Sequence, residues 1–202
     1  MDNKKLILVG ILGIVMLLFG SFQLRAQTLT YDLSLDDNVI GSLTVTRTTQ
    51  GNTMAFDAKS SVTLHLFGET TITIGTTVLY EKDVLQSSTY TVEKDGKPYK
   101  QTTVQYADGG YTVDNDGVVS KIDGPITAST IRLYYEEPKA PVSIFAELEG
   151  IFKSLDALGG NTFELLDPNG NHRNTYVYNK GILSSGQVQH TLYNLTFALR
   201  EP

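Results

Sequence analysis

Apolar and polar residues alternate along much of the chain, most clearly from Met54 to Leu66. Five apolar side chains share one face of this segment, and polar side chains occupy the other. The apolar positions are Met54, Phe56, Ala58, Val62 and Leu64. Ser60 is the one polar residue on the apolar face. A period of two over this length predicts a half-buried antiparallel strand.

Turn sequences interrupt the alternation at short intervals. They occur at Asp36–Asn38, Gln50–Asn52, Phe67–Glu69, Glu81–Asp83, Lys94–Lys97, Ala107–Gly110 and Asn115–Gly117. Asp-Gly and similar pairs tolerate the positive φ of tight hairpin turns. From Thr162 onward, four further strands are expected near 162–166, 174–178, 182–190 and 193–200. The pattern predicts an all-β protein, an antiparallel meander of about 11 strands that forms either a barrel or a strongly curved sheet.

The period changes between residues 127 and 153. Ile131, Tyr134 and Tyr135 are three and four residues apart, which is a helical spacing. A second helical face is predicted after Pro141, formed by Ile144, Phe145, Leu148, Ile151 and Phe152. We therefore expect a short helical insertion within the meander.

The N-terminal segment has the layout of a secretory signal peptide. Lys4 and Lys5 precede an uninterrupted apolar run, Leu6–Phe19, and Ala26 provides a small residue at a cleavage point. The alternative is a retained membrane anchor, but the run is shorter than the roughly 20 residues that span a bilayer. Residues 1–26 are expected to be removed, which leaves one exported domain, 27–202. Periplasmic and extracellular locations both remain open, and membrane contact is expected only through an uncleaved signal segment.

Composition excludes several classes of function. The chain carries a net charge of −6, and removing residues 1–26, which carry +2, would leave −8. An acidic domain is a poor partner for nucleic acid or anionic membranes, so no nucleic-acid partner is expected. The chain contains no cysteine, which excludes disulfides, thiol catalysis and thiolate metal sites.

Sequence motifs for catalysis and metal binding are not found. The three histidines, His65, His172 and His190, have no metal-ligand spacing. The chain has neither a Gly-x-Ser-x-Gly element nor a phosphate-binding glycine loop. We expect a protein that is not an enzyme and has no metal, cofactor or catalytic residue.

Several motifs together resemble a family of exported bacterial β-rich proteins of unknown function. An opening Thr30–Asp32 and Ile40–Val45 are similar to its first hairpin, and Arg132–Pro138 to its most distinctive stretch. Further similarity lies at Gly124–Thr127, Leu166–Gly170 and Tyr176–Gly181. The resemblance implies an exported β-rich fold and supplies no activity. The layout is distantly similar to envelope β-barrels or half-barrels that carry lipids, an analogy of fold that does not establish function.

Candidate ligand-binding residues follow from this layout. Tyr134, Tyr135, Glu136 and Glu137 are expected to form a polar rim. Inward-facing apolar residues are expected to line a cavity: Phe56, Leu64 and Ile72, with Met54, Val62, Ile74 and Val78. The alternative is that these residues fill a solid core, that the tyrosines pack onto the sheet and that Arg132 pairs with a glutamate.

Two functions therefore remain open. In the first, the protein is a non-enzymatic binder or carrier of an apolar or amphipathic, lipid-like molecule in the cell envelope. In the second, it is a structural or protein-interaction module of the envelope with a filled core, and its partner is another envelope protein.

Overall fold

The computed structural model describes residues 24–65, 68–139, 141–169, 173–189 and 194–201. These residues form fourteen strands and one short 3-10 helix, η1. The elements are β1 (Arg25–Leu35), β2 (Asn38–Gln50), β3 (Thr53–Leu64), β4 (Thr70–Glu81), β5 (Val84–Lys94), β6 (Lys97–Ala107), β7 (Gly110–Asn115), β8 (Val118–Asp123), η1 (Thr130–Tyr134), β9 (Val142–Ala146), β10 (Ile151–Gly159), β11 (Thr162–Leu166), β12 (Arg173–Asn179), β13 (Ile182–Gln189) and β14 (Asn194–Leu199).

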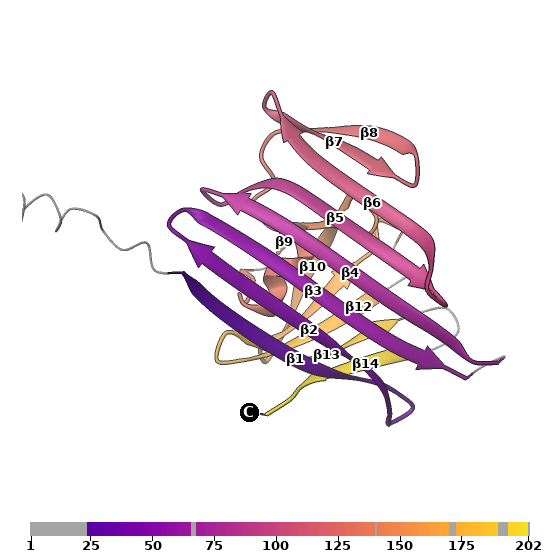
Figure 1. Cartoon of the computed structure of the whole chain (residues 1–202). Coiled ribbons are helices and arrows are strands. Elements are labelled where there is room, and N and C mark those ends of the chain that lie inside the picture. The colour runs from indigo at the N-terminus through magenta and orange to yellow at the C-terminus, as the bar shows by residue number, and fades with distance from the viewer. Residues whose placement is uncertain (1–23, 66–67, 140, 170–172, 190–193, 202) are drawn as a thin grey trace, which may run out of the picture.

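All fourteen strands belong to one antiparallel sheet. Its order runs from β8 back to β1, then from β14 back to β9, so the pairing of β1 with β14 joins two consecutive meanders. In Figure 1, the strands of the first meander lie in front of those of the second, with η1 between the two layers. Strands β8 and β9 end the sheet order and are not joined to each other. The predicted all-β antiparallel meander is confirmed, and it is a curved sheet rather than a closed ladder.

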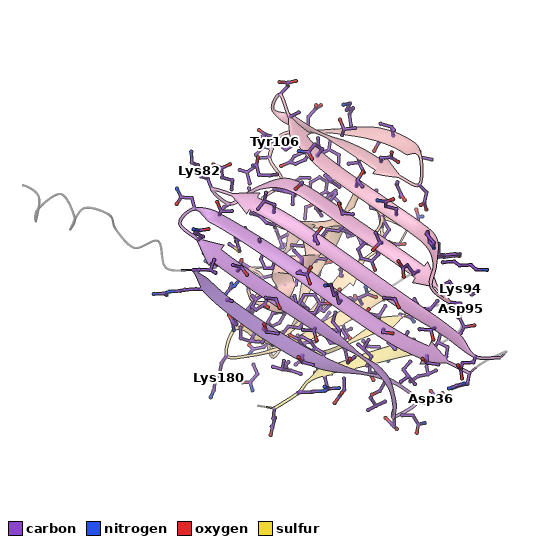
Figure 2. The ribbon with its side chains drawn as sticks, viewed as in Figure 1. Asp36, Lys82, Lys94, Asp95, Tyr106 and Lys180 are labelled. Carbon is purple, nitrogen blue, oxygen red and sulfur yellow. The ribbon has the colours of Figure 1, made fainter. Side chains whose placement is uncertain are left out.

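The predicted turns connect the strands. Asp95, Asp108 and Asp116 have φ values of 52°, 54° and 52°, and each precedes a glycine that also has a positive φ. Asp36, Lys82 and Lys180 lie at further hairpin tips around the rim of the sheet (Figure 2). The left-handed backbone at Asp95, Asp108 and Asp116 and at the glycines that follow them is the reason for the recurrent Asp-Gly pairs.

The predicted helical insertion between residues 127 and 153 is only partly correct. Its first part is the single 3-10 turn η1, whereas the segment from Ile144 to Phe152 forms β9, a turn and β10. Ile144, Phe145 and Ala146 are buried on both faces of β9, so this strand has no apolar–polar alternation. A short apolar run of this kind has no period that separates a buried strand from a helix. The strand count is therefore fourteen rather than about eleven.

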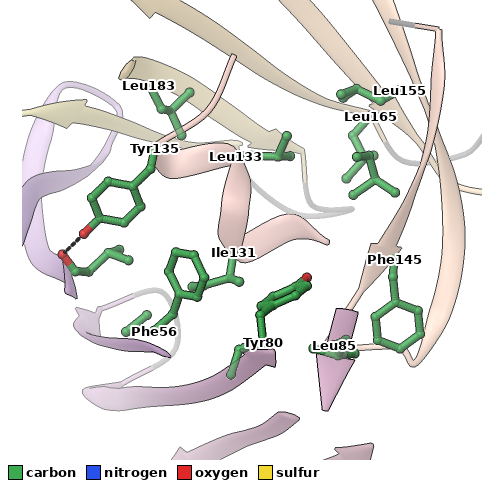
Figure 3. Packing of buried hydrophobic residues seen from close by; sticks show 14 of the residues in the cluster. Phe56, Tyr80, Leu85, Ile131, Leu133, Tyr135, Phe145, Leu155, Leu165 and Leu183 are labelled. Atoms are coloured by element: carbon green, nitrogen blue, oxygen red, sulfur yellow. Dashed lines mark hydrogen bonds between the residues drawn. The ribbon is translucent and has the colours of Figure 1, made fainter. Parts of the chain in front are cut away.

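The core forms where η1 crosses the interior of the sheet. Figure 3 shows Ile131 and Leu133 on this turn, between Phe56 and Tyr80 of the first meander and Leu165 of the second. Buried tyrosine hydroxyls fix the arrangement by bonding to backbone carbonyls across the interior. These bonds are Tyr31 to Leu183 O (2.9 Å), Tyr178 to Leu133 O (2.8 Å) and Tyr111 to Leu85 O (3.0 Å). Each of them satisfies two groups that would be costly to bury alone.

The turn between β9 and β10 (residues 147–150) contacts β6 and β7, near the other end of the sheet order, through side-chain hydrogen bonds and not through strand pairing. Thr102 Oγ1 of β6 donates a hydrogen bond to Leu148 O (2.7 Å), and Asn115 Nδ2 of β7 donates one to Glu149 O (3.0 Å). Gly150 adopts a φ of +69° directly against Val113 of β7. Side-chain contacts therefore close the interior where backbone pairing stops.

Most of the predicted signal peptide, residues 1–23, lies outside the described residues, and β1 begins at Arg25. Within the described residues, no helix has the length and apolar character needed to cross a membrane.

Candidate functional site

A cavity of about 370 Å³ that is partly open to solvent lies between the two meanders. Its walls come from the inner faces of both, and η1 contributes one side. The apolar lining consists of Leu33, Leu43, Ala58, Val62, Ile72, Ile74, Ile131, Leu133, Ala146, Leu148, Leu165, Leu183, Val188, Leu195 and Phe197. The polar lining consists of Ser60, Thr76, Tyr90, Thr130, Tyr134, Glu147, Glu149, Lys153, Asn174 and Tyr176.

The cavity arises where the inward side chains are short. Along β3, Phe56 fills the core, whereas Ser60 and Val62 on the same face line the cavity. The partner strand β4 follows the same rule, because Tyr80 fills the core and Ile74 lines the cavity. Each strand thus has one inner half with large rings and one with small side chains, which cannot reach across the interior.

Five of the polar lining residues belong to η1, the β9–β10 turn and the start of β10: Thr130, Tyr134, Glu147, Glu149 and Lys153. The other five lie on β3, β4, β5 and β12. Glu147 is 2% exposed and accepts hydrogen bonds from the Thr130 hydroxyl and from the Ile131 N–H (3.2 Å). Burial raises the pKa of Glu147, and hydrogen bonds from Ser129, Thr130 and Ile131 oppose that rise. The buried carboxyl is held in place by donors, but no cation forms a salt bridge with it among the described residues.

Three tyrosines, Tyr90, Tyr134 and Tyr176, line the cavity together with Glu147. Burial raises the pKa of Tyr134 well above its ordinary value, with smaller contributions from Tyr176, Tyr31, Tyr90 and Glu147. Burial likewise raises the pKa of Tyr176 to about 12, and Glu149 and Glu147 add to the increase. Tyr90, Tyr134, Tyr176 and the two glutamates all line the same cavity.

Lys153 is the only cation that lines the cavity among the described residues. Its ammonium group lies 2.9 Å from Glu149 Oε1 and 3.0 Å from Asp167 Oδ1, and its side chain is 9% exposed. Burial alone would lower the pKa of Lys153, but the two carboxylates more than offset this and raise it. The lysine is therefore charged and already paired with two acids.

Only part of the predicted site lies at the cavity. Ile72 and Tyr134 line it, together with Val62 and Ile74. Phe56 and Tyr135 lie in the core with ring centroids 5.9 Å apart, and the Tyr135 hydroxyl lies 2.6 Å from Val45 O. Val78 is also buried in the core, and Met54 packs against it.

The remaining predicted residues lie elsewhere. Leu64 is half-buried at the end of β3 and does not line the cavity. Glu136 pairs with Arg132 at 2.9 Å and lies 3.8 Å from Arg47, whereas Glu137 is exposed. The four consecutive residues 134–137 thus do not form a common rim.

Sequence reasoning did not identify Tyr90, Glu147, Glu149, Lys153 or Tyr176 as site residues. Glu147 and Glu149 fall in the segment expected to be helical, so their positions in a turn were not foreseen. One signal was present in the sequence: Ser60 is a polar residue on an apolar face, and it lines the cavity.

No group of three or more His, Cys, Asp or Glu side chains suitable for a metal ion occurs among the described residues. His65 is exposed, and His172 and His190 lie outside the described part of the chain.

The fold resembles that of a solved structure at low sequence identity. The crystal structure of a beta-barrel-like protein of domain of unknown function DUF1849 from Brucella abortus matches with a TM-score of 0.59 and 14% identity. The match covers 86% of this chain and 95% of that chain, which shows a shared fold. No curated protein matches the chain. The family described as "Domain of unknown function (DUF6134)" matches residues 31–200, and the chain belongs to this family.

Proposed function

We propose that the protein is exported and acts as a non-enzymatic binder or carrier of an apolar or amphipathic molecule, held in the cavity between the two meanders. The observation that carries the proposal is a partly open cavity of about 370 Å³ with mostly apolar walls next to the buried core. This volume falls in the usual range for small-molecule sites. The cavity is partly open to solvent, so its apolar walls face water when no ligand is bound. A bound apolar molecule would remove these walls from water.

The proposed lack of enzymatic activity rests on the chemistry of the lining. Ser60, Thr76 and Thr130 are the lining hydroxyls besides the tyrosines, and no histidine lines the cavity among the described residues. Thr130 donates a hydrogen bond to the Glu147 carboxyl, but a nucleophile also needs donors that stabilise the developing oxyanion, and the Ile131 N–H is already bonded to Glu147. These groups suit the positioning of a ligand better than its conversion.

Native mass spectrometry of the protein, purified from its own envelope without detergent, tests the proposal. We expect a stoichiometric extra mass that extracts into organic solvent. The Ile74→Trp variant, which fills the cavity, should lose that mass. Thr73→Trp is the matched control, because Thr73 is the neighbouring residue on β4 and is exposed. Circular dichroism would verify that both variants keep the β fold.

A ligand-free mass that persists after incubation with envelope lipids would contradict the proposal and favour a second candidate, a protein-interaction module. One observation supports that candidate. Val118 and Val119 are 72% and 60% exposed on β8, which is an edge strand of the sheet. Exposed apolar edge strands are ready sites for pairing with another chain.

A further inference from the structure

We propose that the cavity selects amphiphiles whose head group is a positively charged amine or ammonium, rather than those with a carboxylate or phosphate head. The inference rests on the proposed ligand-binding function and specifies the chemistry of the ligand. The geometry points to it through three features of the polar lining: acidic groups, a cation that is already paired, and aromatic rings.

The first feature is an excess of acid. Glu147 and Glu149 both line the cavity, and they are presented by the same turn between β9 and β10. Hydrogen bonds from β6 and β7 to the carbonyls of Leu148 and Glu149 fix that turn. The two carboxyl groups are therefore held at the cavity by the backbone rather than by a flexible loop.

The second feature is that an anionic head group would find no free cation. Lys153, the one lining cation in the described part of the chain, lies 2.9 Å from Glu149 and 3.0 Å from Asp167. A carboxylate ligand would have to displace one of these acids and would leave the charge of that acid unpaired beside its own. Like charges at short range in a partly buried site are strongly unfavourable.

The third feature is aromatic. Tyr90, Tyr134 and Tyr176 line the same cavity as the two glutamates. Aromatic rings attract cations through their negative faces, and the attraction is stronger where water is excluded. Hydroxyls of the core tyrosines Tyr31 and Tyr178 bond to backbone carbonyls, whereas no such bond engages Tyr90 or Tyr134 in the described part of the chain. Their hydroxyls remain available to a ligand.

The apolar walls complete the match. The inner faces of β3 and β4 supply apolar wall to the same cavity through Val62, Ile72 and Ile74. A single alkyl chain would cover these residues while its head group lies among the tyrosines and the two acids.

Displacement of the neutral dye N-phenyl-1-naphthylamine from the delipidated protein tests the proposal. The competitors are dodecyltrimethylammonium and dodecanoate, each below its micelle concentration, and dodecanol, below its solubility limit. They have the same alkyl chain and differ in the charge of the head group. We expect dodecyltrimethylammonium to bind about tenfold or more tightly than dodecanoate, as expected for a partly desolvated cation near rings and acids.

Two variants locate the preference. Glu149→Gln and Glu147→Gln should each reduce binding of dodecyltrimethylammonium and leave dodecanol unchanged. Glu81→Gln is the control, because it removes the same charge from an exposed position outside the cavity. If Glu147→Gln does not fold, Glu149→Gln alone carries the test.

The outcomes separate the two proposals. Dodecanoate binding as tightly as dodecyltrimethylammonium would overturn the head-group inference while the cavity still binds ligands. A cationic preference unchanged in both glutamate variants would also overturn it, because the net acidity of the protein would then be the cause. Failure of the dye and all three competitors to bind would overturn the proposed function itself.

Discussion

Glu147 is a fully buried carboxyl group, and its burial disfavours the ionised form. Its neighbours at the cavity are Tyr90, Tyr134 and Tyr176, which are neutral, and Glu149, which is acidic. Tyr80 lies on the core side and is likewise influenced by Glu147. Burial raises the pKa of Glu147 above its ordinary value despite its hydrogen bonds. The folded protein therefore holds the Glu147 proton at pH values where the unfolded chain has lost it.

This shift predicts a pH-dependent stability. Between the unfolded pKa, about 4.3, and the raised native value, the folded state binds more protons than the unfolded state. The free energy of unfolding should then fall as pH rises, by up to about 1.4 kcal/mol per pH unit. Urea denaturation of the wild type and Glu147→Gln between about pH 4 and pH 8 measures this. The wild type should lose stability relative to the variant on going to the higher pH.

The comparison with the variant removes the contributions of all other acids, which titrate in both proteins. Glu81→Gln serves as the control, since its exposed side chain should leave the pH profile of the wild type unchanged. Parallel profiles for the wild type and Glu147→Gln would show that this carboxyl has an ordinary pKa in the folded protein.

The turn between β9 and β10 depends on one glycine. A Cβ atom at Gly150 would lie 2.5 Å from Val113 Cγ1, and the φ of +69° is unfavourable for other residues. Gly150→Ala should therefore cost about 1–3 kcal/mol of stability, because it combines backbone strain with overpacking. Chemical denaturation measures this cost. Because the same turn carries Glu147 and Glu149, ligand binding should weaken as well.

A matched control isolates the contact with Val113. Gly160 has a similar φ of +59°, but a Cβ atom there would meet no atom within 4 Å. Gly160→Ala measures the backbone strain alone, and the additional loss in Gly150→Ala measures the close approach. Equal losses in the two variants would mean that the turn is free to move away from β7.

The sequence predicted strands well wherever one face meets solvent and the other meets the interior. β3 is the clearest case, since Phe56 and Ala58 are buried while Asp57 and Lys59 are exposed. β9 was not predicted as a strand, because its central residues are buried on both faces and show no alternation. The candidate site depends on that segment, and Glu147 was missed for this reason.

The cavity itself was predictable only in outline. The alternation of inward and outward side chains along the strands placed Val62, Ile72 and Ile74 on the inner face, and all three line the cavity. The same alternation also places Phe56 and Val78 on the inner face, but these two residues fill the core instead. Whether an inward residue lines the cavity or fills the core depends on where along the strand η1 and the second meander approach it. That position is set by contacts between residues distant in sequence.

The whole molecule is organised so that its two meanders meet at β1 and β14. Tyr31 pairs with Leu199 across this junction, and the Tyr31 hydroxyl bonds to Leu183 of β13. The interior is thus continuous, although β8 and β9 remain separate edges. Every described residue before Leu29 is exposed, and Leu29 is the first buried residue of β1.

The proposed export predicts a new N-terminus that the β1 ladder can accommodate. Cleavage after Ala26 would remove Arg25 and Ala26, which are exposed and pair only with Thr49 and Thr48 of β2. Gln27 would remain, and its carbonyl oxygen lies 2.9 Å from the Tyr135 hydroxyl. N-terminal sequencing of the protein from the envelope or medium fraction should therefore begin at Gln27.

The free energy of unfolding of a chain that starts at Gln27 should lie within about 0.5 kcal/mol of that of a chain that starts at Leu24, because only exposed residues differ. A chain that starts at Leu29 also lacks the Gln27 carbonyl and leaves the Tyr135 hydroxyl with Val45 alone, so it should be measurably less stable. An unprocessed N-terminus in the cell would contradict cleavage and indicate that the segment is retained as a membrane anchor.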